Sequence, residues 1–178
     1  LLNWFSAISM TMRPKKTKKK TIKKTARRLP VVAGWRELVH LPDLGIGPII
    51  AKLDTGARTA ALHAVTLEIY QSDEGERIRF DAFVDDAVSH AKRCDLPLAG
   101  KRRVKNPGGG VEERALVTTR LSLGGKIWTV EVTLTDRAEM GVPMLLGRAT
   151  MKRRLVVHPS KSFVLSADER AAQKNKGR

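Results

Sequence analysis

The sequence predicts a mainly β domain with one short helix near its C-terminal end. Apolar and polar side chains alternate with a period of two over residues 77–84 and 115–135, as in strands that bury one face. Glycines and other turn-forming residues separate these runs. Only residues 145–154 show a helical pattern, and a short strand closed by Pro159 is expected to follow them.

The first elements lead to an acidic residue. Turn-forming residues are dense over 42–48, and the mostly apolar run 49–53 that follows has the length of a strand. This run ends abruptly at Asp54, within the tripeptide Asp-Thr-Gly. Farther along, residues 72–75 are predicted to form the turn of a hairpin. The pattern therefore places Asp54 where a buried strand turns.

The second half of the domain contains the clearest hairpin. Apolar residues share one face on each side of a turn at Gly124-Gly125, over Ala115 to Thr135. Before it, residues 85–111 look less regular and end in the glycine-rich segment Asn106 to Gly110. We expect a mobile loop in that segment.

Composition divides the chain into three parts. Residues 1–30 are predicted to be a disordered basic arm, residues 31–166 the folded domain and residues 167–178 a flexible polar tail. The formal net charge is +16, but Arg13 to Arg28 alone contains ten basic and no acidic residues. A run of like charges is usually a solvated tail, with contact to nucleic acid, a ribosome or lipid as the alternative.

Two further features bear on the cellular location of the protein. The apolar opening, residues 1–10, is too short for a membrane span and lacks the leading charges of a signal peptide. Cys94 is the only cysteine, which excludes an intrachain disulfide and fits a reducing compartment. A cytoplasmic protein is expected.

Three features in order carry a resemblance to the retropepsins. A strand ends in Asp54-Thr55-Gly56-Ala57, a long hairpin follows, and Leu145-Leu146-Gly147-Arg148 opens a helix near the end of the domain. This order resembles the retropepsin pattern, which implies a closed acid-protease β-barrel. The resemblance implies that Asp54 is a catalytic carboxylate, supported by Thr55 and Gly56, and that substrate is bound by the residues Ala57, Arg58, Gly147 and Arg148.

A narrower resemblance covers Val32 to Ser166. The segments Ala51 to Thr59 and Met140 to Arg148 look like a bacterial family named ATP-dependent zinc proteases. That family is associated with ATP-grasp enzymes that add glutamates to a ribosomal protein, and its fold is retropepsin-like. Its name implies a metal enzyme, whereas its fold implies an aspartic one.

The residues favour the aspartic alternative. A catalytic zinc needs about three protein ligands, usually on a rigid element, but only His90 and Cys94 lie close together in the sequence. There is also no phosphate-binding Gly-x-x-x-x-Gly-Lys loop. We therefore expect neither metal nor cofactor. The remaining candidate zinc ligands are His40, His63 and His158.

Aspartic chemistry predicts a homodimer. Two carboxylates about 3 Å apart share one proton and activate a water between them. The domain has one Asp-Thr-Gly, so Asp54 of a second copy must supply the other carboxylate across a twofold axis. Two alternatives stay open: the zinc-dependent protease of the family name, and a non-catalytic module that docks on a ribosome or an ATP-grasp partner.

Arg58 departs from the retropepsin pattern. Viral retropepsins have a carboxylate at this position, which pairs with the arginine that corresponds to Arg148. One hypothesis is that Arg58 and Arg148 grip acidic side chains of a peptide substrate, such as a glutamate-tailed protein. The alternative is that Asp136 or Glu139 pairs with them.

The flap that would cover the substrate is either Asn106 to Gly110 or Gly124-Gly125.

Overall fold

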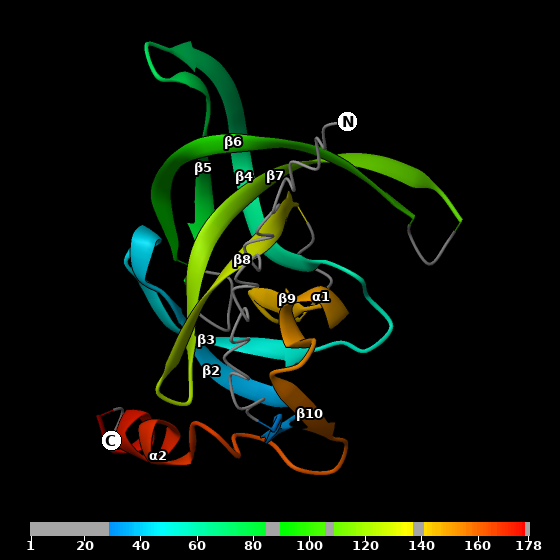
Figure 1. Ribbon diagram of the computed structural model, residues 1–178. Helices are drawn as coiled ribbons and strands as arrows, with labels where there is room; N and C mark the ends of the chain where they lie inside the picture. The colour runs from blue at the N-terminus through cyan, green and yellow to red at the C-terminus, as the bar shows by residue number, and fades with distance from the viewer. Residues whose placement is uncertain (1–28, 85–89, 106–108, 137–140, 177–178) are drawn as a thin grey trace, which may run out of the picture.

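The computed structural model describes residues 29–84, 90–105, 109–136 and 141–176 (Figure 1). The basic arm up to Arg28 lies outside these residues, as do Asn106 to Gly108 and Glu139. The fold is mainly β, as predicted. Within the described residues, no helix is both long and apolar enough to cross a bilayer.

One large sheet forms the body of the domain. Its eight strands run in the order β2-β3-β9-β4-β5-β6-β7-β8, and additional pairings of β2 with β7 and of β4 with β8 curl it into a ring. A separate two-stranded parallel sheet joins β1 to β10. The strands are β1 (Val31–Gly34), β2 (Arg36–Leu41), β3 (Ile46–Leu53), β4 (Ala60–Ser72), β5 (Gly75–Phe83), β6 (Ala91–Lys105), β7 (Val111–Leu123), β8 (Lys126–Thr135), β9 (Met144–Leu146) and β10 (Leu155–His158).

The predicted hairpins are confirmed. β4 and β5 join through the turn at 72–75, and β7 and β8 join at Gly124-Gly125, where both glycines have positive φ. Such φ values suit the tight turns that match the twist of paired strands. The apolar faces of these strands form most of the core, including Phe80, Leu121 and Leu134, which are fully buried.

Two local predictions about the second half were wrong. Residues 91–105 form the long strand β6 rather than irregular chain, because β5 pairs with their first half and β7 with their second. The helix predicted over 145–154 is shorter: residues 144–146 are strand β9, and helix α1 covers only Arg148–Met151. Pairing with β3 and β4 overrides the helical pattern of the leucines.

The C-terminal segment is helical, although a flexible polar tail was expected. Helix α2 spans Ala167–Lys176. It begins beside Glu37, a buried side chain on β2 whose carboxylate accepts hydrogen bonds from the backbone N–H groups of Val164, Leu165 and Ser166. His40 contacts Glu169 at 2.6 Å. These contacts tie the end of the domain to β2. The remaining short helix, η1, spans Pro42–Leu44.

Candidate functional site

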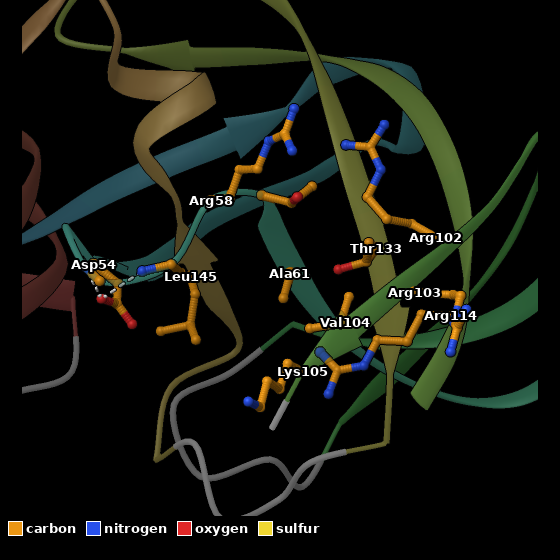
Figure 2. Close-up of a pocket in the computed structure, with 13 residues that line it drawn as sticks. Asp54, Arg58, Ala61, Arg102, Arg103, Val104, Lys105, Arg114, Thr133 and Leu145 are labelled. Carbon is orange, nitrogen blue, oxygen red and sulfur yellow. Dashed lines mark hydrogen bonds between the residues drawn. The ribbon is translucent and has the colours of Figure 1, made fainter. Parts of the chain in front are cut away.

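Asp54 occupies the first position after β3, where β9 still holds the backbone. Its N–H donates to the carbonyl oxygen of Leu146 at 3.0 Å, which extends the parallel pairing of β3 with β9. The Asp54 Oδ1 atom accepts hydrogen bonds from the N–H groups of Gly56 at 2.8 Å and Ala57 at 3.1 Å. Both bonds fall on Oδ1, so Oδ2 is the oxygen that is available to a ligand (Figure 2).

Gly56 leaves room for the Asp54 carboxylate in this turn. A Cβ atom at position 56 would lie 3.1 Å from the Asp54 Oδ1 atom, which is closer than side-chain contacts normally come. With a side chain there, the carboxylate would have to shift by a few tenths of an ångström. The Asp-Thr-Gly motif thus caps its own turn and at the same time fixes the rotamer of the acid.

The Leu-Leu-Gly-Arg segment lies directly against the Asp54 turn. A Cβ atom at Gly147 would come within 2.5 Å of the Thr59 carbonyl oxygen, so the two backbones approach as closely as only glycine permits. The N–H of Arg148 donates to the carbonyl of Ala57 at 2.9 Å, and that of Ala149 donates to the carbonyl of Arg58 at 2.9 Å. The two motifs form one rigid unit.

Arg148 has backbone partners. Its Nη1 donates to the carbonyl oxygens of Thr55 at 2.7 Å and Gly56 at 2.8 Å. The Asp136 carboxylate, considered as a partner from the sequence, instead lies 4.0 Å from the Nδ1 of His63. Arg148 therefore braces the Asp54 turn through two backbone carbonyl groups.

A cavity of about 700 Å³ opens beside Asp54. Asp54, Gly56, Ala57 and Arg58 line one side, and the ends of β6 and β7 line the other (Figure 2). Five basic residues and a single carboxylate line this space. The basic residues that line the cavity are Arg58, Arg102, Arg103, Lys105 and Arg114.

Two of these five cations are neutralised locally. Arg114 is buried, and its guanidinium donates to Glu112 at 2.8 Å and 3.0 Å. Arg102 lies 3.0 Å from Glu131 on β8. Among the described residues, Arg58, Arg103 and Lys105 have no ion-pair partner within 4.0 Å. The cavity therefore carries excess positive charge, which attracts anions.

The cavity also bears on the position of the flap. Residues 102–105, at the end of β6, line the same space as Asp54 and lead into the segment Asn106 to Gly110. Gly124-Gly125 lines a different hollow, next to helix α2. The first of the two segments nominated from the sequence follows these cavity-lining residues in the chain, and its residues 106–108 lie outside the described part of the structure. The basic residues of β6 and β7 were missed, although the run Lys101 to Lys105 stands directly before the glycine-rich segment.

Thr55 and Arg148 do not line this cavity. They line a second, shallow hollow of about 630 Å³, together with the apolar side chains of Met151, Leu155 and Val157. Arg58 contributes to both spaces. Asp54 itself is only partly buried.

The candidate zinc ligands are scattered. His63 is buried against Phe83, Cys94 is buried on β6, and His158 contacts Ser160. In the described part of the chain, no group of three His, Cys, Asp or Glu side chains is close enough to hold a metal ion. These residues do not fit the zinc centre that the name of the resembling family implies. Burial raises the pKa of the Cys94 thiol, which also disfavours its thiolate form.

Comparison with known proteins identifies the family. A model described as RimB-like, "Retropepsin-like aspartic endopeptidase RimB", matches residues 32–168. Two curated relatives are each named "Probable alpha-L-glutamate ligase": one from Desulfotalea psychrophila is 38% identical over 132 residues, and one from Shewanella halifaxensis is 35% identical over 135 residues. These matches cover 72% and 75% of this chain but only 28% and 30% of the relatives. The chain thus spans less than a third of their length.

A solved structure has the same fold. It is a Legionella pneumophila protein whose function is described as unknown, with a TM-score of 0.63 and 31% sequence identity. The match covers 76% of this chain and 98% of the Legionella chain.

Proposed function

The chain belongs to the RimB-like family of retropepsin-like aspartic endopeptidases, and we propose that it hydrolyses peptide bonds with a dyad formed by Asp54 of two protomers. The observation that carries the proposal is the Asp54 turn itself. One carboxylate oxygen is held by two backbone N–H groups, while the other is available beside a cavity of about 700 Å³.

A dyad would work by sharing one proton. Two carboxyl groups about 3 Å apart cannot both ionise, so the ionised one accepts a proton from a bound water while the protonated one donates to the substrate carbonyl oxygen. The water oxygen attacks the carbonyl carbon and gives a tetrahedral gem-diol. As its C–N bond breaks, the proton taken from water passes to the leaving nitrogen, and the carboxylate that donated its proton takes one back from a hydroxyl of the gem-diol. Thr55 and Gly56 hold the turn, and Arg148 braces it.

The second protomer would sit against the exposed side of the turn. Thr55 and the apolar side chains of Met151, Leu155 and Val157 border an open hollow there. Val156 on β10 is also half-exposed, and a second copy would bury this surface around a twofold axis. A homodimer therefore supplies both the missing acid and a cover for these side chains.

The proposed substrate is an acidic peptide segment. Arg58 lines the cavity next to the catalytic turn without an ion-pair partner among the described residues, and an arginine can bind a carboxylate with two parallel hydrogen bonds. The relatives' names refer to joining glutamate. Glutamate-rich chains are therefore the substrates to test first, with Arg58 and Ala57 as substrate contacts.

The test is cleavage by wild type, Asp54→Asn and Asp73→Asn. Asp73 is exposed in the turn between β4 and β5, so its substitution is a matched loss of one acid far from the site. We expect Asp54→Asn to lower kcat/KM by about 10²- to 10⁴-fold with an unchanged circular dichroism spectrum. Equal activity of wild type and Asp54→Asn would exclude the dyad.

A second candidate is a binding module without turnover. The match to a segment of much longer proteins named glutamate ligase favours it, because a domain of this kind can serve to recruit a substrate for a joined enzyme. It predicts that no peptide is cleaved and that Asp54→Asn binds acidic peptides as tightly as wild type does.

A further inference from the structure

The free end of the β6–β7 hairpin contains a regular pattern of charge. β6 pairs with β5 up to Pro97 and then with β7 from Leu98 onwards. The change of partner coincides with a bulge at Gly100, which has a φ of 125°. Bulges of this kind bend a strand and re-aim its side chains. Beyond the bend, Arg102 to Lys105 border the Asp54 cavity.

Exposure alternates strictly along this end of β6. Lys101, Arg103 and Lys105 are exposed, whereas Arg102 and Val104 are half-buried. Alternate residues of a strand point to the same face, so Arg103 and Lys105 share a face and are separated by two residue steps, roughly 6.7 Å. Figure 2 labels Arg103 and Lys105 among the residues that line the cavity with Asp54.

The four basic residues from Lys101 to Lys105 differ in whether they already form ion pairs. Lys101 lies 3.4 Å from Glu113, and Arg102 lies 3.0 Å from Glu131. Arg103 and Lys105 have no ion-pair partner among the described residues, although Glu112 and Glu113 on β7 are close in the pairing register. Of the three basic residues of β6 that line the cavity, Arg103 and Lys105 are thus the two without an ion-pair partner among the described residues.

We propose that Arg103 and Lys105 together recognise two carboxylates at alternate positions, i and i+2, of an extended substrate. A peptide bound in extended form repeats its side chains at the same spacing as β6, so two such carboxylates meet both cations at once. Carboxylates at adjacent positions point to opposite sides of an extended chain, so only one of the two cations is contacted. The inference rests on the proposed peptidase function and adds a spacing rule to its substrate.

The size of the expected binding preference follows from the exposure of both cations. A solvent-exposed ion pair contributes at most about 1 kcal/mol, so one lost contact corresponds to a two- to fivefold change in affinity. Because the contacts are exposed, the preference should shrink as salt rises.

Two labelled peptides of identical composition test the rule. Each carries two glutamates in a neutral sequence, at positions i and i+2 in the first peptide and at adjacent positions in the second. The full chain is used with Asp54→Asn, and binding is measured by fluorescence anisotropy. Because the peptides carry equal charge, nonspecific attraction to the ten cations of residues 13–28 acts on both alike.

We expect the i, i+2 peptide to bind about two- to fivefold more tightly. Arg103→Gln and Lys105→Gln should each remove the preference. Lys101→Gln, which removes the same charge from the same face of β6 outside the cavity lining, should keep it. Equal binding of the two peptides, or a preference that survives in Arg103→Gln, would overturn the spacing rule.

Cleavage of the same peptides by wild type separates this inference from the function on which it rests. If the binding preference is present and neither peptide is cleaved, the peptidase function fails and the recognition element stands. If both peptides are cleaved at equal rates and bind equally, the peptidase function stands and the recognition element fails.

Discussion

The guanidinium of Arg148 donates a 2.7 Å hydrogen bond to the carbonyl oxygen of Thr55, 93 positions earlier in the chain. This contact joins the opening of helix α1 to the residue that follows the candidate catalytic acid. Since the same Nη1 also donates to Gly56, one side chain holds two consecutive peptide groups. The shape of the Asp54 turn therefore depends on a residue far away in the sequence.

Replacing Arg148 should loosen this turn. We expect Arg148→Met to lower the free energy of unfolding by about 1 kcal/mol, because two carbonyl groups lose a charged donor. Peptidase activity should fall further than this loss of stability explains, since the acid is no longer held in place. Urea unfolding and kcat/KM measure the two effects. Lys161→Met, an exposed cation elsewhere, should change neither.

Mixing protomers tests whether two copies share one active site. When wild type exchanges with a tenfold excess of Asp54→Asn protomers, most wild-type chains pair with an inactive one, and activity should fall about tenfold. Activity assays after incubation of the mixture measure this effect. An excess of Asp73→Asn should not suppress activity. Unchanged activity in the first mixture would mean that each protomer works alone.

Glu37→Gln should destabilise the whole domain. The Glu37 carboxylate is fully buried and accepts hydrogen bonds from four backbone N–H groups and from the Ser166 hydroxyl. Glutamine keeps one acceptor oxygen but turns an NH₂ group towards these donors. The free energy of unfolding should drop by roughly 2–4 kcal/mol, measured from the urea midpoint. For the exposed Glu113→Gln, a change below about 0.5 kcal/mol is expected.

Asp95 gives the domain an acid-sensitive contribution to stability. A hydrogen bond from Tyr70 at 2.6 Å, together with one from Arg77 at 2.7 Å, holds the pKa of the Asp95 carboxyl below its ordinary value of 3.8. The folded state then binds fewer protons than the unfolded state. The contribution is therefore complete above the unfolded pKa and is lost as pH falls through the folded one.

Asp95→Asn should reveal this contribution. The variant should be less stable than wild type at about pH 7, and its stability should decline less steeply between about pH 5 and pH 2. Urea midpoints across this range measure both slopes. If the slopes of wild type and variant are parallel, Asp95 is not the group responsible.

Much of the sheet could be predicted because its strands obey local rules. The β7–β8 hairpin combines period-two alternation with a glycine pair at its turn, and both signals lie within a short window of sequence. β6 was missed because Lys101 to Lys105 is too polar to indicate a strand by itself. Its conformation comes from pairing with β5 and β7.

Only the site residues that belong to a recognisable sequence motif could be predicted. Asp54 and Gly147 could be brought together in advance because the order of their motifs resembles a known family. The basic residues of β6 could not be assigned to the site in advance, because their place near Asp54 depends on the bend at Gly100 and on how far the hairpin extends. The backbone partners of Arg148 are likewise invisible in the sequence.

The bend at Gly100 separates two walls of the cavity that differ in how firmly they are held. One wall of the cavity is bound into the central ring and into the segment around Gly147, where small changes are costly. The other wall is a protruding ribbon whose last residues, among the described strands, pair only with each other. Substitutions in the ribbon should therefore change which peptides bind while leaving the geometry of the Asp54 turn as it is.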